Sequence, residues 1–251
     1  MTFFKRITII AIFSTFLTAC MTSAQINQEA EKNYTQVKQQ ARAQNAIDTT
    51  SATAKRIHAV FNKMKPYAEK ANHTGVPFQW EITVFRSNEL NAWAMPGGKM
   101  AFYTGLAEKL NLSNDEIAVV IGHEMAHALQ EHGKSDRTVS VISGIVGVLA
   151  DAAVTATTGV STEGLLSTGV DLIATKPFSR SQETEADEIG LILMAQSGYN
   201  PEAAPNLWAK MSKASGNSGA SIFSTHPSNE ERQENLARLL PKAKQIYNAS
   251  K

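Results

Sequence analysis

The segment Ser113–Gly133, SNDEIAVVIGHEMAHALQEHG, decides the fold of this chain of 251 residues. Ser113 and Glu116 have the spacing of a capping box, in which each side chain satisfies a free backbone N–H at the start of a helix. An apolar run follows, and Gly133 is a typical helix stop. The segment therefore predicts a buried helix from Ser113 to about His132.

Two histidines of this helix lie four residues apart. His123 and His127 are separated by about one helical turn, so both imidazoles project from one face. Glu124 lies beside them, and H-E-x-x-H on a helix is the pattern that binds one zinc ion and supplies a carboxylate base. We therefore expect one zinc ion per chain. The weaker alternative is a core helix whose histidines only make hydrogen bonds.

A catalytic zinc site needs a third protein ligand. The metzincin pattern would require Gly at position 130 and His at position 133, where this chain has Gln130 and Gly133. His132 is five residues beyond His127, about 140° around a continuous helix. We therefore expect His132 to face away from the metal and to have a structural role.

A downstream acidic segment, Ser179–Asp187, contains a better candidate for the third ligand. Glu183 and Asp187 are four residues apart and share a helical face. Glu183 can ligate zinc, and Asp187 can accept the second N–H of a ligand histidine. Glu185, about 200° from Glu183 around the helix, should point elsewhere. The alternative is a solvated acidic face, which the upstream H-E-x-x-H motif disfavours.

The remaining pattern predicts an α+β fold that is mainly helical, with a small β-sheet. We expect these elements: a helix around Ile57–Met64, strands at Gln79–Arg86, Asn91–Met95 and Lys99–Tyr103, helices at about Ser181–Ser197 and from Pro201, and a last helix opened by a capping box at Ser228 and Glu231. Residues 51–251 should form a single domain in which 135–178 is a flap or an insertion. Residues 20–50 are expected to form a polar tether or an N-terminal helix.

The N-terminus has the pattern of a lipoprotein signal peptide. Two basic residues precede the apolar run Ile7–Leu17, which is shorter than the roughly 20 residues that a membrane-spanning helix needs. Leu17-Thr-Ala-Cys20 resembles a bacterial lipobox, so residues 1–19 should be removed and Cys20 acylated in the bilayer. The alternative is an ordinary signal peptide. Met21 favours the outer membrane, on its periplasmic face.

Charge and cysteine content exclude several classes of function. The chain has 24 Lys and Arg against 23 Asp and Glu, and a net charge of +1 gives no basic surface of the kind that nucleic acid requires. We therefore expect no nucleic-acid partner. One cysteine cannot build a disulfide framework or a cysteine-based zinc site, so metal chemistry here must use His, Asp or Glu.

Three motifs in order resemble one peptidase family. His123–His127, Ser179–Asp187 and His226–Arg232 match H-E-x-x-H, S-R-x-x-E-x-x-A-D and H-P-x-x-x-E-R. This order is similar to the gluzincin zinc metallopeptidases that include HtpX, the Oma-type proteases, the CAAX prenyl endopeptidases, BepA and LoiP. The segment from Asn91, NAWAMPGG, also matches the family's edge-strand motif. With its lipobox, the chain resembles most the LoiP type of periplasmic lipoprotein metalloprotease.

The resemblance implies a zinc-dependent metalloendopeptidase whose edge strand lines the active site. The implied roles are zinc binding by His123, His127 and Glu183 and proton transfer by Glu124. Asp187 is expected to hold a ligand histidine by a hydrogen bond or to donate a proton. Substrate pairing is expected of Asn91, Ala92, Trp93 and Ala94. His226 is expected either to stabilise the oxyanion, the role we favour, or to cover the zinc as a fourth ligand. Arg232 is expected either to support the site or to lie on the surface.

The implied substrates are unfolded or extended polypeptides, namely misfolded or unassembled envelope proteins, and outer-membrane assembly factors are candidate partners. A zinc-dependent chaperone with rare proteolysis is the alternative function.

Overall fold

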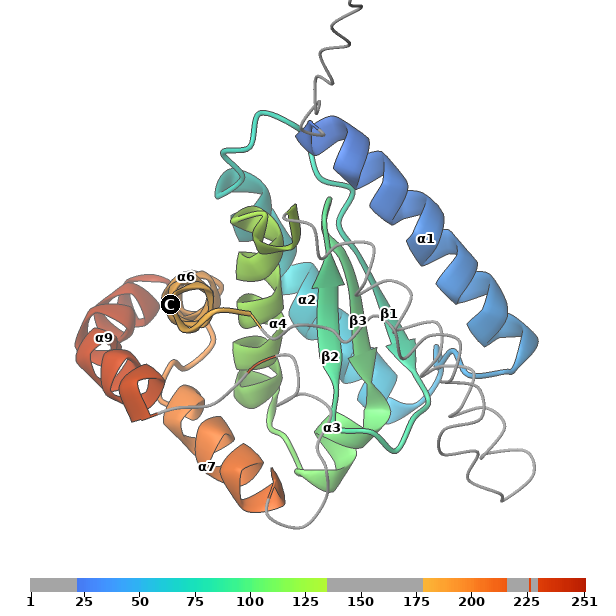
Figure 1. The fold of residues 1–251 in the computed structure, drawn as a ribbon. Coiled ribbons are helices and arrows are strands. Elements are labelled where there is room, and N and C mark those ends of the chain that lie inside the picture. The colour runs from blue at the N-terminus through green and yellow to red at the C-terminus, as the bar shows by residue number, and fades with distance from the viewer. Residues whose placement is uncertain (1–21, 135–177, 216–225, 227–229) are drawn as a thin grey trace, which may run out of the picture.

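The computed structural model describes residues 22–134, 178–215, 226 and 230–251 (Figure 1). Its elements are α1 (Ser23–Ala43), α2 (Ala52–Lys70), β1 (Glu81–Phe85), β2 (Ala92–Met95), β3 (Lys99–Tyr103), α3 (Thr104–Lys109), α4 (Asn114–Leu129), η1 (His132–Lys134), α6 (Arg180–Gln196), α7 (Ala203–Ser215) and α9 (Glu230–Ala249). Helices surround a small sheet, so the predicted α+β class is confirmed.

The sheet has three strands in the order β1-β3-β2. β1 and β3 are parallel, whereas β2 and β3 form an antiparallel hairpin. The hairpin turns at Gly97 and Gly98, which have φ angles of 77° and 82°. A Cβ on Gly98 would also lie 2.7 Å from the Trp80 ring, so only glycine fits there. Among the described strands, β2 is therefore an edge strand.

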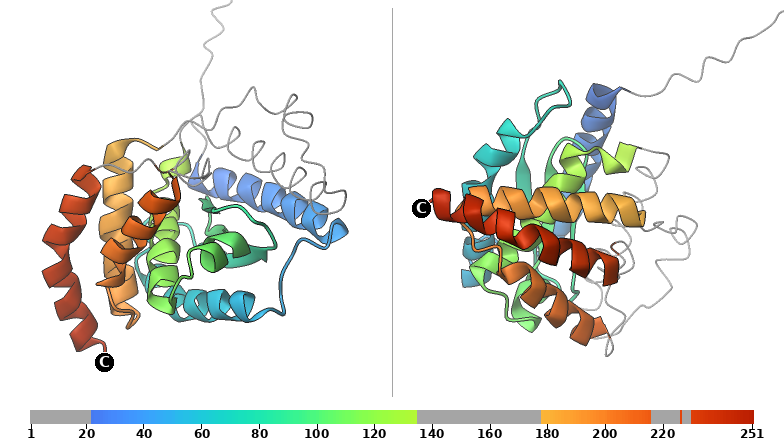
Figure 2. Two further views of the ribbon diagram at one scale, coloured as in Figure 1. Left: turned by 90° about the horizontal axis from the view of Figure 1, so that it is seen from below. Right: turned by 90° about the vertical axis from the view of Figure 1, so that its left-hand side faces the viewer.

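Alternation along β2 divides the core between two layers. Ala92 and Ala94 belong to or contact the main apolar core, which includes α2 and α4, whereas Trp93 and Met95 join a second cluster beneath α1. Figure 2 shows α1 and α2 on opposite sides of the sheet. The Tyr34 hydroxyl of α1 donates to the Met100 carbonyl at 2.8 Å. The helix α1 is thus packed on the sheet that carries the edge strand.

The predicted capping box of Ser113 and Glu116 opens α4, as the pattern indicated. The expected end of this helix near His132 was wrong, because α4 stops at Leu129. Glu131 has a left-handed φ of 50°, which breaks the helical path before Gly133 is reached. His132 therefore lies outside the α-helix, in the short 3₁₀ segment η1.

A pair of glycines brings α4 and α6 into close contact. A Cβ on Gly122 would lie 2.7 Å from the Gly190 carbonyl oxygen, and a Cβ on Gly190 would lie 2.7 Å from the Gly122 carbonyl carbon. Backbone therefore meets backbone at this crossing. Ser179 caps α6 and forms a capping box with Gln182. Figures 1 and 2 show α9 on the outer side of α6, away from the sheet.

Several predictions fall outside the described residues. They concern the signal peptide, Cys20, most of the segment 135–178 and the capping box at Ser228. Within the described part of the chain, none of the helices combines the length and apolar character needed to cross a bilayer.

Candidate metal centre

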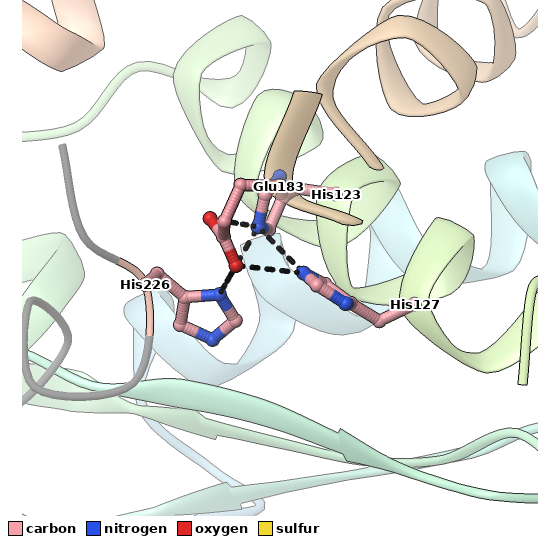
Figure 3. A group of neighbouring side chains, drawn as sticks. All are labelled: His123, His127, Glu183 and His226. Atoms are coloured by element: carbon pink, nitrogen blue, oxygen red, sulfur yellow. Dashed lines mark hydrogen bonds and ion pairs between the residues drawn. The ribbon is translucent and has the colours of Figure 1, made fainter. Parts of the chain in front are cut away.

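Four buried side chains converge between α4 and α6 (Figure 3). His123 and His127 come from α4, Glu183 comes from the first turn of α6, and His226 precedes α9. One donor atom from each of the four lies within 4.8 Å of the others. The structure therefore brings together the three expected ligands, and it adds His226 to the same cluster.

The donor separations given by these contacts are within about 0.3 Å of those around a tetrahedral zinc ion. Bonds of about 2.0–2.2 Å hold tetrahedral ligand atoms roughly 3.3–3.6 Å apart. The Nε2 atoms of His123 and His127 are 3.0 Å apart, and His127 Nε2 lies 3.3 Å from Glu183 Oε1. His226 Nδ1 lies 3.2 Å from His123 Nε2 and 3.0 Å from Glu183 Oε1. The donor set of nitrogen and carboxylate oxygen is the one that zinc prefers.

Glu124 lies beside this cluster with its side chain buried. Its Oε1 is 3.4 Å from His226 Nε2 and makes no hydrogen bond among the described residues. A buried carboxylate oxygen without a hydrogen bond normally requires a partner, such as water. This oxygen is therefore available to accept a proton from a molecule bound at the cluster.

A second layer of charged groups holds the ligands in place. Asp187 Oδ1 lies 2.9 Å from His123 Nδ1, which leaves Nε2 of that ring for the metal. Arg232 is buried, and it donates to Asp187 through Nε at 2.7 Å and Nη2 at 2.9 Å. Its Nη1 lies 2.6 Å from Glu183 Oε2. The alternative of a surface arginine was therefore wrong, and Arg232 instead bridges the two carboxylates of α6.

The electrostatics of the cluster favour a cation. Burial lowers the pKa of His123, but the charge of Glu183 and the hydrogen bond to Asp187 outweigh burial and raise this pKa to about 10. Burial holds the pKa of His127 well below its usual value, so this imidazole is neutral at physiological pH. Burial raises the pKa of Glu183, yet His123 outweighs burial and keeps that carboxyl ionised. The carboxylates of the cluster thus favour positive charge among the four donors.

The expectation that His132 faces away from the metal site was wrong. Since α4 ends at Leu129, the 140° argument does not apply, and the ring turns back toward His127. Their Nδ1 atoms are 2.9 Å apart, and His132 Nε2 lies 3.0 Å from Glu185 Oε2. Glu185 is not one of the four converging donors and its side chain is half exposed, in agreement with the prediction from its position on α6.

Two aromatic neighbours of the site had not been singled out from the sequence. The Phe178 ring stacks on His127 with a centroid distance of 4.0 Å, and it directly precedes the Ser179 cap. Trp208 lies under the Arg232 guanidinium at 4.1 Å. An apolar hollow beside Glu124 is lined by Val119, Val120, His123, Leu207, Trp208, Met211 and His226. In the sequence, only Trp208, a single tryptophan within an amphipathic helical segment, could have indicated this apolar lining.

The edge strand β2 packs along α4, the helix that carries the histidines. Asn91 precedes the strand, and its carbonyl accepts a hydrogen bond from the Tyr103 amide at 3.1 Å. Its side-chain Oδ1 is buried and makes no hydrogen bond among the described residues. Ala92 and Trp93 are buried, whereas Ala94 is half-buried. The strand thus has one paired side, toward β3.

Comparison with known proteins identifies the family. A family model described as peptidase family M48 matches residues 51–240. Mitochondrial metalloendopeptidase OMA1 of Schizosaccharomyces pombe is 37% identical over 171 residues, which are 66% of this chain and 48% of that protein. OMA1 of Arabidopsis thaliana is 34% identical over 185 residues, 73% of this chain and 36% of the relative. Metalloprotease LoiP of Escherichia coli is 29% identical over 186 residues, 74% of this chain and 70% of LoiP.

The chain spans about a third to a half of the length of these two OMA1 relatives. The family model, in contrast, covers well over half of this chain and includes both helices of the metal centre, His226 and Arg232. The predicted resemblance is therefore confirmed, and the chain belongs to peptidase family M48.

Proposed function

We propose that this protein is a zinc-dependent metalloendopeptidase. The observation that supports this function best is the arrangement of His123, His127 and Glu183 around one point, with the free oxygen of Glu124 beside it. Two histidines and a glutamate hold zinc in one class of metallopeptidase and leave a position for water or substrate. When bound, zinc supplies Lewis acidity that activates water and polarises a carbonyl group.

The residues of this chain provide the proton transfer and the positioning. Glu124 Oε1 takes a proton from the attacking water and returns it to the leaving amine nitrogen. Asp187 keeps the His123 ring oriented, and Arg232 holds both Asp187 and Glu183. Because these supports are buried, the ligands need little reorganisation when a substrate binds.

Substrate binding is assigned to the edge strand. The side of β2 that no described strand covers offers main-chain N–H and C=O groups to an extended polypeptide, which would add a strand to the sheet. Main-chain hydrogen bonds contribute affinity without reading side chains. The proposed substrates are therefore unfolded or extended chains, and the sequence preference should be loose.

His226 has two proposed roles that exclude each other in one state. As an oxyanion donor it would face the reacting carbonyl group, whereas as a fourth ligand it would cover the metal. In this structure His226 Nδ1 is as close to Glu183 and His123 as a ligand would be. This geometry supports the covering role for the resting protein, and it requires His226 to move before a carbonyl group binds.

The cellular setting is also proposed. The lipobox pattern at Cys20 supports an acylated protein held at the bacterial outer membrane, facing the periplasm. In that setting the substrates would be misfolded or unassembled envelope proteins, and assembly factors of the outer membrane would be partners.

A second function follows if His226 stays in place. A chain whose metal is covered could bind clients through the edge strand and cleave them rarely, as a chaperone or assembly factor. The buried Glu124 argues for the peptidase, because a binding protein has no need of a base at this position.

The test compares degradation of casein by the wild type and by Glu124→Gln. General-base catalysis contributes roughly 10²–10⁴-fold in rate, so the variant should lose nearly all activity and keep its zinc. Glu188→Gln is the matched control, because Glu188 lies on α6 but pairs with Asn235 of α9. Equal degradation by Glu124→Gln and wild type would refute the role of Glu124. An inactive wild type that binds clients and zinc would favour the chaperone.

A further inference from the structure

A chain of hydrogen bonds connects His127 to the surface of α6. His127 Nδ1 lies 2.9 Å from His132 Nδ1, and His132 Nε2 lies 3.0 Å from Glu185 Oε2. The side chains of His127 and His132 are buried, whereas that of Glu185 is 50% exposed. Neither His132 nor Glu185 is one of the four converging donors.

The direction of these hydrogen bonds follows from Glu185, the outermost residue of the series. The Glu185 carboxylate can only accept, so His132 Nε2 must carry a hydrogen. With a hydrogen on Nε2 alone, His132 has a lone pair on Nδ1, and it accepts the hydrogen on His127 Nδ1. The remaining nitrogen of His127, Nε2, is left with a free lone pair. That nitrogen is the one that faces His123 and Glu183.

The two ligand histidines thus acquire the same tautomer by different means. His123 donates directly to the buried Asp187. Among the described residues, the partner of His127 Nδ1 is the imidazole of His132, not a carboxylate. The imidazole of His132 in turn contacts the Glu185 carboxylate. Stacking of Phe178 at 4.0 Å limits rotation of the His127 ring from its face.

The backbone is arranged to permit this contact. On a continuous helix, His132 would lie on a different side from His127. Glu131 adopts a left-handed φ of 50°, a conformation that is unfavourable for a residue other than glycine. Gln182 Nε2 then reaches the carbonyl of His132 at 3.5 Å. The strained turn and this contact bring His132 under the ligand.

We propose that His132 and Glu185 are positioning residues for zinc, which act through His127 by fixing its tautomer and ring orientation. This inference rests on the proposed zinc site. Loss of an outer partner of a ligand histidine typically weakens metal binding by about 10–100-fold. His132 should therefore control how tightly the protein holds zinc, although it does not touch the ion.

Two substitutions at His132 separate hydrogen bonding from packing. Leu fills most of the space of the imidazole but offers no acceptor, whereas Asn is smaller and places an oxygen near the position of Nδ1. We expect His132→Leu to raise the zinc dissociation constant by about 10–100-fold and His132→Asn to recover most of that loss. If His132 only filled space, the order would be reversed, because Asn would leave a cavity.

A second pair of variants tests Glu185, the outermost residue of the hydrogen-bond series. Glu185→Ala should weaken zinc binding in the same direction but by a smaller factor, because the half-exposed carboxylate can be replaced by water. Glu188 lies on the same helix but pairs with Asn235 and Arg238. The zinc affinity of Glu188→Ala should therefore equal that of the wild type.

The measurement is a zinc titration of each full chain in competition with a chromogenic chelator, with thermal unfolding recorded alongside as a check on folding. Equal zinc affinity of His132→Leu and the wild type would overturn the inference alone. Zinc binding by His132→Asn as weak as that by His132→Leu would also overturn it. A wild type that binds no zinc would refute the proposed function, and this inference with it.

Discussion

Replacing Gly190 with Ala tests whether the crossing of α4 and α6 sets the geometry of the metal centre. The new Cβ would lie 2.7 Å from the carbonyl carbon of Gly122 and from the amide nitrogen of His123. Ordinary van der Waals contact begins at 3.4 Å, so the helices must separate locally by roughly 0.7 Å. The obstacle is backbone, which cannot rotate out of the way as a side chain can.

The expected loss of stability is the difference of two terms. Overpacking a core typically costs about 1–3 kcal/mol, whereas Ala gains about 1 kcal/mol over Gly in a helix interior. We expect a net loss of at most about 2 kcal/mol in the free energy of unfolding. For a chain of this size the melting temperature should fall by at most about 8 °C.

The metal centre should suffer more than the stability. His123 follows Gly122 directly, and Glu183 lies on the same helix as Gly190. A ligand shift of roughly 0.7 Å exceeds the tolerance of about 0.2 Å in metal–ligand distances. We therefore expect zinc affinity to fall by at least about tenfold, the lower end of the effect of misplaced ligand support.

Thermal unfolding and zinc titration of the same protein check both expectations. Gly75→Ala is the matched control: it adds the same methyl group where nothing lies within 4 Å, in a turn with φ of 78°. That variant should lose stability through backbone strain and keep its zinc affinity. A Gly190→Ala protein with wild-type zinc affinity would show that the glycine contact does not position the ligands.

Three further predictions concern the metal ligands, the role of His226 and the acylation of Cys20. His127→Ala and Glu183→Ala should both lose the stoichiometric zinc of the wild type, and metal analysis that still finds one ion per chain would contradict the assigned site. His226→Ala should retain zinc. If His226 covers the metal, peptide hydrolysis by the variant should exceed that of the wild type, whereas if His226 stabilises the oxyanion, the rate should fall by roughly 10²–10³-fold. An unchanged rate would contradict both roles. Cys20→Ala should abolish incorporation of a clickable fatty acid, and undiminished labelling would refute the lipobox interpretation.

The ligand set could be predicted from sequence because it depends on local geometry. His123 and His127 share a helical face wherever the helix is placed, and so do Glu183 and Asp187. The capping box at Ser113 located the start of α4 for the same reason. Short-range periodicity therefore determined which side chains can converge.

The parts that could not be predicted depend on contacts between distant segments. Gly122 and Gly190 each read as a weak point in a helix, and only their meeting shows why glycine is needed. The left-handed conformation at position 131 is adopted by a glutamate and not by a glycine, so the sequence does not indicate it. The contact of His132 with His127 therefore could not be predicted. Burial of Arg232 depends on how α9 packs against α6.

The N-terminal helix α1 has a helical apolar periodicity that its polar average composition does not reveal. Its buried positions, Ile26, Ala30, Tyr34, Val37 and Ala41, recur at helical spacing within a segment that is polar on average. This helix lies outside the part of the chain that the family model matches. A narrow apolar stripe was therefore enough to attach α1 to the sheet.

Charge balance explains why this cluster suits a divalent ion. Glu124, Glu183 and Asp187 are buried carboxylates, and the guanidinium of Arg232 is buried with them. With neutral histidines, three negative charges and one positive charge leave a net charge of −2, which Zn²⁺ would neutralise. The raised pKa of His123, about 10, reflects the same demand, because a proton on that ring supplies part of the missing positive charge. Burying such a set without a cation would be costly, so metal binding and folding of this region should be coupled.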